Sequence, residues 1–430
     1  MIKGAFGDNP FNYMKYLVLG KNQALSLAEI VSVYKKKNSI IGKNIILIDE
    51  YFDIKKSVAE LGGVIKGGKI IGNLENSDKE IIRKWITEYV FKLLAEGMIK
   101  KEKKFSFGFS VYSDRDKFNR NFIKKMAMDL KKILREQGIN SRWVVSKEED
   151  NLSSIVVGEN KLYLENNGFE ANIIDIDNKI YIGETEIVQN YMEYSKLDYG
   201  RPLRDARAGM LPVKLAKIMI NLSGAEIENT ILDPFCGSGT ILQEALIIGH
   251  KKIIGSDFSK QAMENSEKNI EWLKKNYPEI TKEKDLLLIN TPVEKLSGAI
   301  KKETISAIVT EPYLGPPIRK GVLFDIQKII KNLSKVYLKS FIQFKEVLKN
   351  NGVVVMIWPI FKDDNGIYKF MPIMKEIEEM GFKKVDLLPI ELMEYVKKKY
   401  GQNIVSKRNT IIYSREDQYI KREIVKFIKK

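Results

Sequence analysis

A glycine-containing segment follows a short apolar stretch in the second half of the chain. Asp233-Pro-Phe-Cys-Gly-Ser-Gly-Thr240 comes directly after Ile231-Leu232. Glycines between a strand and a helix let a ligand approach the backbone closely, and the first turn of the helix offers unpaired N–H groups. A dinucleotide fingerprint requires a further glycine three residues after the second one, and Leu242 occupies that position. The pattern therefore favours a ligand site and disfavours a dehydrogenase.

An acidic residue ends the next apolar segment. Asp257 lies 18 residues after Gly239 and closes the stretch 253–257. A carboxylate at the tip of the second strand of a doubly wound sheet is placed to accept hydrogen bonds from both hydroxyls of a ribose. The alternative role for Asp257 is the N-cap of a helix that begins at Lys260. Both roles are compatible, and the nearby glycine loop favours ligand binding.

A third group of polar residues follows a later apolar segment. Residues 307–309 run into Thr310-Glu-Pro-Tyr-Leu-Gly-Pro-Pro317. In open α/β sheets, ligands bind at the carboxyl ends of the strands. A carboxylate and a backbone carbonyl accept hydrogen bonds from an exocyclic amine, and an aromatic ring stacks on a planar base. Without that context, the same string is a proline-rich loop.

Apolar strands alternate with helices from about residue 210 onward. Fully apolar strands in such an alternation predict a parallel sheet with helices on both faces, an α/β fold. We expect an antiparallel hairpin at a sheet edge from residues 410–413 and 423–427. The other predicted strands are 231–232, 253–254, 286–289, 307–309 and 353–357, and the predicted helices are 211–222, 240–249, 260–276, 326–350 and 373–380.

The first half of the chain predicts two smaller α+β units, 14–100 and 101–190. In the first unit, Ser26-Leu-Ala-Glu29 has the pattern of a capping box that opens a helix. In the second unit, a half-buried strand at 105–111 precedes an amphipathic helix at 117–137. Four short strands are predicted after it, at 142–145, 154–157, 162–164 and 171–174.

Charge and composition limit the classes of protein. The 430 residues include 72 Lys and Arg against 56 Asp and Glu, a net charge of +16, of which +12 falls in residues 201–430. This excess suggests a nucleic-acid partner, although solvated lysine-rich surfaces are the alternative. The lone Cys236 and lone His250 exclude a disulfide framework and a histidine-based metal cluster, which leaves only a mixed site with carboxylates, and no metal is predicted. No apolar run is long enough to span a membrane, and we expect a cytoplasmic protein.

Basic residues gather on the amphipathic helix and just after it. They are candidate RNA-binding residues, and the alternative is a solvated surface helix. The candidates are Lys117, Arg120, Lys124, Lys131, Arg135 and Arg142. Cys236 is expected to pack beside the ligand rather than act as a nucleophile, and His250 is expected at the surface after a helix.

The three segments of the second half also resemble motifs of a known family. The 233–240 segment resembles the S-adenosylmethionine loop of class I methyltransferases, particularly those that act on exocyclic amines of nucleobases. Glu311-Pro-Tyr-Leu-Gly315 resembles their Asp/Asn-Pro-Pro-Tyr/Phe motif, and the 207–216 segment resembles the region that meets the methionine end of the cofactor. Residues 16–30 resemble the ferredoxin-like unit, and 151–202 the end of the THUMP domain, of THUMP-containing tRNA methyltransferases. The resemblance is to the archaeal and eukaryotic tRNA guanine-10 N2-methyltransferase family.

The resemblance implies a domain order. It consists of a ferredoxin-like domain (14–100), a THUMP RNA-binding domain (101–190), a linker (191–209) and a Rossmann-like methyltransferase domain (210–430). The last domain is expected to contain a seven-stranded, mostly parallel sheet. The implied cofactor is S-adenosylmethionine and the implied substrate is tRNA, and some relatives work with a small zinc-binding activator subunit.

The resemblance also implies roles for individual residues. The implied catalytic residues are Glu311, Pro312 and Tyr313, which would hold the target amine and its base. Glu311 departs from the Asp or Asn of the family, and Tyr313 stands where the second proline would be. The implied cofactor-binding residues are Met210, Leu211, Asp233, Phe235, Gly237, Gly239 and Asp257, with Asn290 where the family carries an acid.

The expected function is methylation of the exocyclic N2 of a guanosine in tRNA. One alternative keeps the chemistry but changes the substrate to ribosomal RNA or to an adenine or cytosine amine of DNA. Another alternative is a cofactor-retaining RNA-binding protein without turnover. Substitution of Glu311 separates these classes, since only an enzyme would lose turnover while RNA binding survives.

Overall fold

The computed structural model divides the chain into two units. Unit 1 comprises residues 1–23 and 36–191, and unit 2 comprises residues 24–35 and 192–430. The residues described are 14–35, 39–49, 53–75, 78–115, 118–146, 151–203, 210–316, 324–363, 365–401, 403–415 and 419–430. Within them, no helix is both long and apolar enough to cross a membrane.

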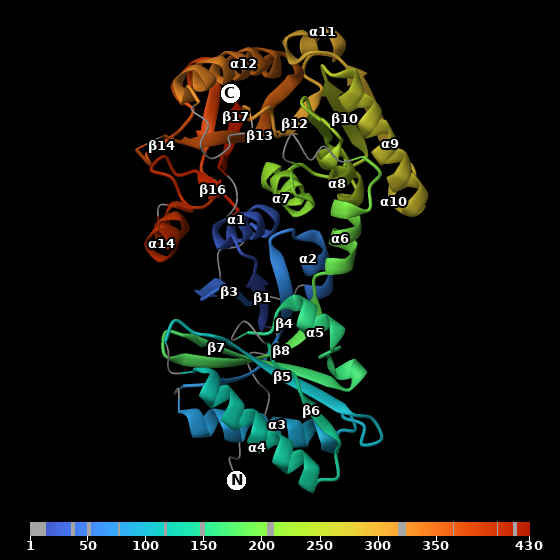
Figure 1. Cartoon of the computed structure of the whole chain (residues 1–430), viewed down its shortest axis with the longest axis vertical. Coiled ribbons are helices and arrows are strands. Elements are labelled where there is room, and N and C mark those ends of the chain that lie inside the picture. The colour runs from blue at the N-terminus through green and yellow to red at the C-terminus, as the bar shows by residue number, and fades with distance from the viewer. Residues whose placement is uncertain are drawn as a thin grey trace. The chain divides into compact units, whose positions relative to one another are not determined.

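Unit 1 is built on one eight-stranded sheet, with the strand order β2-β3-β1-β4-β8-β7-β5-β6. Helices α3 (Lys79–Ala95) and α4 (Arg120–Glu136) lie together on one face (Figure 1). Their apolar side chains form a core with the phenylalanines of β5 and with β7 and β8. The strands are β1 (Met14–Leu19), β2 (Ser39–Gly42), β3 (Ile45–Asp49), β4 (Val64–Leu74), β5 (Phe105–Tyr112), β6 (Ser141–Trp143), β7 (Gly168–Ile176) and β8 (Lys179–Val188).

This sheet contains strands from both of the predicted N-terminal domains. Strand β4 comes from the 14–100 segment, and it pairs with β8 from the 101–190 segment. The division of unit 1 into a ferredoxin-like and a THUMP domain therefore stays a prediction.

Two predicted strands of unit 1 are wrong. Residues 154–157 belong to helix α5 (Ser154–Glu159), where the Ser153 side chain caps the helix by accepting from Val156 N. Residues 162–164 run into a 3-10 turn, Leu164–Asn166. Both segments are short apolar runs, in which hydrophobic periodicity alone does not separate strand from helix.

Unit 2 contains a sheet whose central path has seven strands, in the order β11-β10-β9-β12-β13-β17-β15. The first five run parallel, and β17 is antiparallel to β13 and to β15. The Rossmann-like α/β fold expected from the sequence is therefore confirmed. These strands are β9 (Thr230–Asp233), β10 (Lys252–Asp257), β11 (Asp285–Asn290), β12 (Ile305–Thr310), β13 (Leu348–Lys362), β15 (Phe382–Val385) and β17 (Lys421–Lys429).

The predicted C-terminal hairpin is confirmed, with one difference in its place. Strand β16 (Ile411–Tyr413) pairs antiparallel with β17. Strand β17 is itself interior, because β13 flanks it on one side and β16 and β15 flank successive parts of its other side. Both faces of β17 are consequently buried for most of its length.

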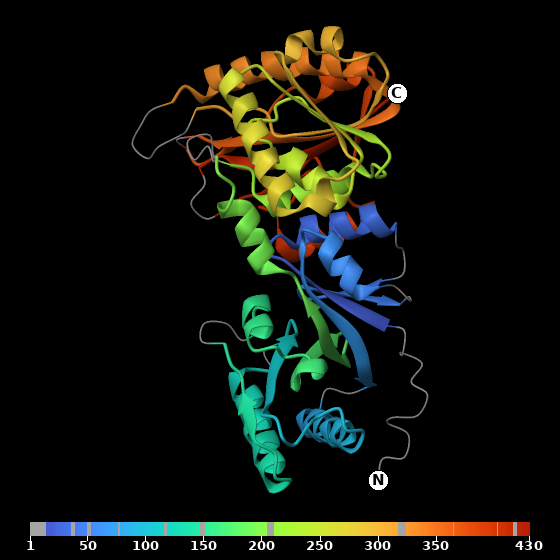
Figure 2. The same ribbon diagram turned by 90° about the vertical axis from the view of Figure 1, so that its right-hand side faces the viewer.

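Helices cover both faces of the unit 2 sheet. Helix α12 (Ile326–Val347) and helix α13 (Met374–Glu379) pack with β13 and β17 into an aromatic-rich core. Helices α7 (Val213–Ser223) and α8 (Thr240–Ile248) lie on the other side of the sheet from α12 (Figures 1 and 2). The other helices of the unit are α6 (Tyr191–Tyr199), α9 (Lys260–Asn276), α10 (Pro278–Thr281), α11 (Leu296–Ala299) and α14 (Ile390–Tyr400).

Helix α1 (Gln23–Tyr34) belongs to unit 2 although the strands on either side of it belong to unit 1. The side chains of Glu29 and Ser32 bind Asn221 of α7: Glu29 accepts from the Asn221 amide, and Ser32 donates to its carbonyl. The predicted capping box at Ser26 is wrong, because the helix begins three residues earlier and Ser26 is buried within it.

Candidate active site

The carboxyl ends of three neighbouring parallel strands bring the predicted site residues to one edge of the sheet. Asp233 ends β9, Asp257 ends β10 and Thr310 ends β12. Asp233 Oδ1 accepts from the Thr310 hydroxyl at 2.7 Å and from Phe235 N at 3.1 Å. Burial, with smaller contributions from the Asp257 and Glu311 carboxylates, raises the pKa of Asp233 to about 7. The Asp233 side chain thus links the end of β9 to the end of the adjacent strand β12.

The glycine segment forms a tight turn between β9 and α8. Gly237 and Gly239 have φ angles of +52° and +82°, in the left-handed region that glycine adopts without strain. A Cβ on Gly239 would lie 3.0 Å from Ser266 Oγ, so a side chain there would crowd α9. A Cβ on Gly237 would meet no heavy atom of the described residues within 4 Å. The turn is therefore packed on the α9 side and open at Gly237.

Asp257 links this turn to the next strand end. Its Oδ2 accepts from Gly237 N at 3.1 Å, and its Oδ1 accepts from Ser259 N at 2.9 Å. Each carboxylate oxygen has a second lone pair, so both retain the capacity to accept a ligand hydroxyl. The N-cap of α9 is Ser259, whose hydroxyl accepts from Ala262 N. The alternative role of Asp257 as N-cap is therefore wrong.

Asn290 is the last residue of β11, beside β10. Its amide donates to the Asp257 carbonyl at 2.8 Å, which fixes the side chain next to the Asp257 turn. Phe235 is partly buried and packs against the core between the sheet and α12. Of the two residues expected at the methionine end of the cofactor, Leu211 is buried and Met210 is partly exposed.

Two residues that the sequence did not indicate hold the segment before the sheet against this site. Arg201 is buried and donates to Thr240 Oγ1 at 2.7 Å and to the Met210 sulfur at 3.5 Å. The amide of Asn269 donates to the carbonyls of Leu203 and Ser238. The partners of Arg201 at Thr240 and of Asn269 are 31 to 66 residues away in the sequence, so no local sequence pattern predicts these contacts.

The predicted catalytic residues follow directly after β12. The Glu311 side chain is 13% exposed, and its Oε1 accepts from Arg422 Nε at 2.5 Å. Burial raises the pKa of Glu311, and the Arg422 charge opposes that rise. Pro312 is buried, whereas Tyr313 is 63% exposed and its carbonyl accepts from the Tyr337 hydroxyl at 2.8 Å. The site thus presents a carboxylate, a backbone turn and an exposed aromatic ring.

The lone cysteine and the lone histidine are both buried. The Cys236 backbone donates to the Ser256 carbonyl, its sulfur lies 3.8 Å from the Met263 sulfur, and burial raises the pKa of the thiol. A buried thiol of raised pKa is a poor nucleophile. His250 is 2% exposed rather than at the surface, because the segment after α8 is bound to the loop before β9 through Lys251 N and the Ile227 carbonyl, and burial lowers the pKa of His250 to about 4.

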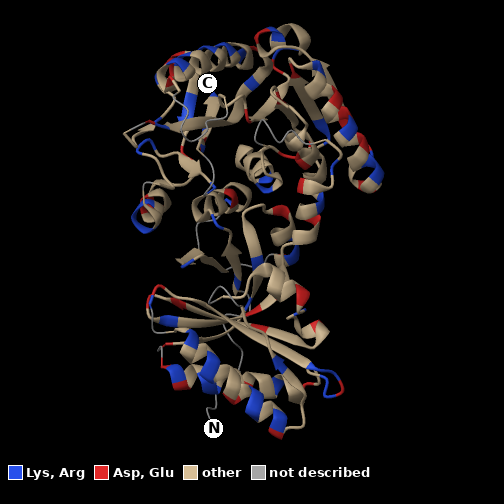
Figure 3. Cartoon of the chain, in the orientation of Figure 1, with Lys and Arg blue, Asp and Glu red and all other residues tan. Residues whose placement is uncertain are grey.

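The predicted RNA-binding residues lie in unit 1, with the exception of Lys117, which falls outside the described residues. The other five are exposed, and four of them lie on α4, along which Figure 3 shows several Lys and Arg positions in blue. Arg120 and Lys124 also line a cavity of about 280 Å³ together with Trp143. This cavity offers two cations and an indole ring, and Leu152 forms part of its wall.

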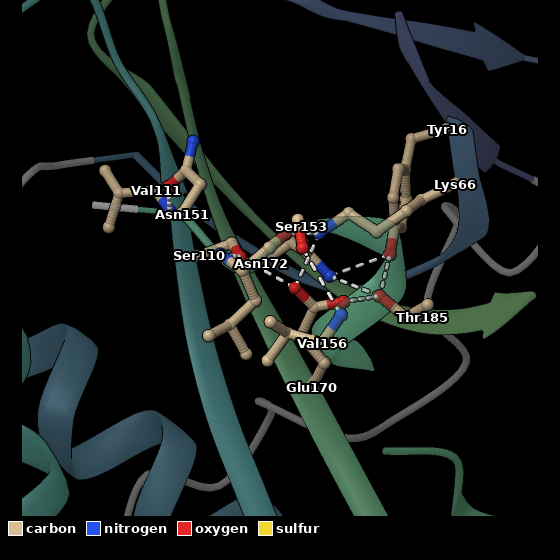
Figure 4. Close-up of polar contacts among 11 residues, drawn as sticks. Tyr16, Lys66, Ser110, Val111, Asn151, Ser153, Val156, Glu170, Asn172 and Thr185 are labelled. Carbon is tan, nitrogen blue, oxygen red and sulfur yellow. Dashed lines mark hydrogen bonds and ion pairs between the residues drawn. The ribbon is translucent and has the colours of Figure 1, made fainter. Parts of the chain in front are cut away.

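A buried polar cluster lies beneath that wall. Lys66 and Glu170 form an ion pair at 2.7 Å, and neither side chain has any exposed surface. Figure 4 shows Tyr16, Lys66, Glu170 and Thr185 pointing toward one another from different strands. Lys66 also donates to the Leu152 carbonyl at 2.9 Å. The cluster therefore fixes the segment that carries Leu152.

A family of known proteins matches the part of unit 2 that carries the strand-end residues of the candidate site. Residues 201–318 match the family described as RMKL-like, methyltransferase domain, and this range spans Arg201, the glycine turn, Asp257 and Glu311. Residues 201–318 form a methyltransferase domain. The cofactor of this methyltransferase domain is S-adenosylmethionine.

Two curated relatives and one solved structure extend this comparison. The chain is 32% identical over 166 residues to the tRNA (guanine(10)-N2)-dimethyltransferase of Methanocaldococcus jannaschii, an alignment that covers 37% of this chain and 42% of that protein. It is 36% identical over 107 residues to a protein of the same name from Methanothermobacter thermautotrophicus, covering 25% and 28%. The chain thus spans less than half of either relative.

The fold as a whole resembles that of TrmN from Thermus thermophilus. The two structures superpose with a TM-score of 0.52 over 97% of this chain and 100% of the other, at 12% sequence identity. At this identity the likeness concerns the fold alone. It extends over both units, including the part of the chain outside the methyltransferase domain.

Proposed function

We propose that the chain is an S-adenosylmethionine-dependent tRNA methyltransferase that modifies the exocyclic N2 of a guanosine, with guanosine 10 as the position. The observation that carries the proposal is the placement of Glu311, Pro312 and Tyr313 at the edge of the sheet that holds the glycine turn. The names of the two relatives of the methyltransferase domain support the choice of substrate.

The residues at the strand ends fit the cofactor. The described residues leave space at Gly237 for a ligand that approaches the backbone, and Asp257 keeps acceptor capacity for two ribose hydroxyls. We assign Asp233, Phe235, Gly237 and Gly239 to the wall of the cofactor site. Met210, Leu211 and Asn290 are assigned to its methionine and adenine ends. When bound, S-adenosylmethionine supplies a methyl group already activated by its sulfonium.

The side chains of the methyltransferase domain would align the amine with that methyl group, and alignment is the larger part of the catalysis. In this proposal Glu311 Oε2 and the Pro312 carbonyl accept hydrogen bonds from the amine, which directs its lone pair. The amine nitrogen takes the methyl group and gives up one proton, for which the Glu311 carboxylate is the acceptor. The exposed ring of Tyr313 would stack on the base.

Unit 1 is proposed to bind the RNA. The exposed basic side chains of α4 suit contacts with phosphates, which position an RNA without reading its sequence. The cavity between Arg120, Lys124 and Trp143 suits one unstacked nucleotide. A cytoplasmic location and a small zinc-binding activator subunit are further parts of the proposal.

The test is a methyl-transfer assay on the full chain with S-adenosylmethionine and unmodified tRNA transcripts. Nucleosides from the digested tRNA are analysed by mass spectrometry. We expect N2-methylguanosine or N2,N2-dimethylguanosine, lost in Glu311→Ala and retained in Glu279→Ala, a control at an exposed position of α10. Methylated adenosine or cytidine would contradict the assigned base. Cofactor and tRNA binding without any product, with the activator subunit added, would favour a binding protein without turnover.

A further inference from the structure

The Glu311 carboxylate is held by a residue far away in the sequence. Arg422 lies on β17, 111 residues after Glu311, and its side chain is 4% exposed. Strand β17 pairs with β13, where Arg422 lies opposite Pro359, and β13 pairs with β12, which ends next to Glu311. The sheet thus brings the guanidinium to the end of β12 from two strands away.

The contact uses only part of the carboxylate. Arg422 Nε donates to Oε1 at 2.5 Å, and no other described group donates to the Glu311 carboxylate. Oε2 therefore retains its lone pairs for a donor that comes from a ligand. A bidentate pair, which is common between Arg and a carboxylate, would have occupied both oxygens.

The surroundings of Glu311 would otherwise favour its neutral form. Among the described residues, those with an electrostatic interaction with Glu311 are Arg422 from β17, Asp233 from β9 and Tyr337 from α12, and Arg422 is the one cation of these three. Burial penalises the charged form of Glu311, and the Arg422 guanidinium favours it. A protonated Glu311 would be unable to accept a proton from the amine.

We propose that Arg422 is a positioning residue for the methyl transfer, which keeps Glu311 ionised and leaves its Oε2 as the acceptor for the target amine. The inference rests on the proposed function. It also accounts for Glu at position 311, where the family motif has Asp or Asn. An aspartate at the same backbone position would be shorter by one carbon–carbon bond, about 1.5 Å, and would withdraw its carboxylate from Arg422.

The test compares Arg422→Gln and Arg422→Lys with the unmodified chain. The pKa of Glu311 is measured by NMR of chains with ¹³C-labelled glutamate side chains, in which the Glu311 signal is identified by its loss in Glu311→Gln. We expect Arg422→Gln to raise this pKa by about 1 or more. We expect turnover at pH 7 to fall at least about tenfold and to recover as the pH is raised, with KM for tRNA unchanged.

Several controls keep the outcomes distinct. Arg422→Lys should retain most of the turnover, since it keeps the charge, and Arg415→Gln, at an exposed position, should match the unmodified chain. If Arg422→Gln does not fold, Glu311→Asp tests the same contact from the other side and should show the same shift of the pH profile. An unchanged Glu311 pKa and an unchanged pH profile in the folded variants would overturn the role of Arg422. An unmodified chain without product would overturn the proposed function instead, while the NMR measurement still decides the pairing.

Discussion

Each unit contains a buried pair between a basic side chain and a glutamate, and the two pairs are completed differently. In unit 1, Glu170 receives three side-chain donors: Lys66 and Ser110 bind Oε1, and Thr185 binds Oε2. In unit 2, Glu311 receives Arg422 alone among the described residues, and it does so on one oxygen. Both oxygens of the Glu170 carboxylate therefore have donors within the protein, whereas Oε2 of Glu311 remains able to accept a hydrogen bond from a ligand.

The neighbours of each pair agree with this difference. The Lys66 pair is closed over by Tyr16, Asn172 and the Leu152 carbonyl, and it has no exposed surface. Glu311, by contrast, is followed two residues later by Tyr313, which is 63% exposed. Buried ion pairs are weak evidence for stability in general. The two pairs differ in two respects. The Glu311 side chain is partly exposed and has an oxygen that no described residue binds, whereas the Glu170 side chain is fully buried and both of its oxygens are bound.

Loss of one partner of the Lys66–Glu170 pair should cause the largest loss of stability. We expect Lys66→Met to destabilise unit 1 by about 3–5 kcal/mol, because Glu170 is left as a buried charge without its cation. Urea-dependent hydrogen exchange of the β7 and β8 peptides measures this within unit 1. The double variant Lys66→Met/Glu170→Gln should recover part of the loss.

An exposed pair provides the control for that measurement. Lys179 and Glu75 lie 3.7 Å apart with more than half of each side chain exposed. Lys179→Met should change stability by less than about 1 kcal/mol. An equally small effect of Lys66→Met would mean that the buried pair adds nothing that its neighbours do not already supply.

A substitution in the Glu311–Arg422 pair should lower activity rather than stability. We expect Glu311→Gln to lower kcat for tRNA methylation by about 10²–10³-fold, the range for loss of one preorganised group in a transition state. The same change at Glu170 should act on the unfolding of unit 1 and leave kcat within about threefold per active molecule. A folded Glu311→Gln chain with full turnover would contradict the assignment of the acceptor.

Asp233 supplies a third case, a buried carboxyl without a cation. No basic side chain of the described residues pairs with it, and burial raises its pKa from 3.8 to about 7. The folded state therefore binds the proton more tightly than the unfolded state, and stability falls as the pH rises from about 4 to about 7. Asp233→Asn should abolish that fall and stabilise unit 2 at pH 8 by at most about 4 kcal/mol. Unfolding curves at pH 4, 6 and 8 measure the difference, and parallel curves for the two chains would refute it.

Substitution of single basic residues on α4 should have the smallest effect, a modest loss of tRNA affinity. Arg120→Gln and Lys124→Gln should each weaken tRNA binding and lower the slope of log K against log salt by about 1, without a change in kcat at saturating tRNA. Lys55→Gln, at an exposed position of α2 (Ile54–Glu60), is the matched control. Slopes that stay equal in all three variants would place the RNA elsewhere on the molecule.

The sequence predicted the elements and the edge of the sheet that carry the site, because local patterns determine both. Asp233, Asp257 and Glu311 each end an apolar run, and parallel strands align such ends. Arg422 and Arg201 were not predicted, since their contacts depend on the strand order and on the path before the sheet. Residues 154–157 show the same limit at the level of secondary structure: the Ser153 cap and the packing of Val157 decide for a helix, whereas the apolar run alone does not.

The assignment of α1 to unit 2 bears on how this chain can be divided. The backbone passes from one unit to the other near residues 23, 35 and 191, so no single cut separates them. A fragment that starts at residue 192 lacks the helix whose Glu29 and Ser32 bind Asn221, and it would expose that part of α7. A gene encoding a free-standing version of the catalytic part would need to carry this helix as a fused segment. In this architecture, one element of unit 2 is encoded in the N-terminal part of the sequence.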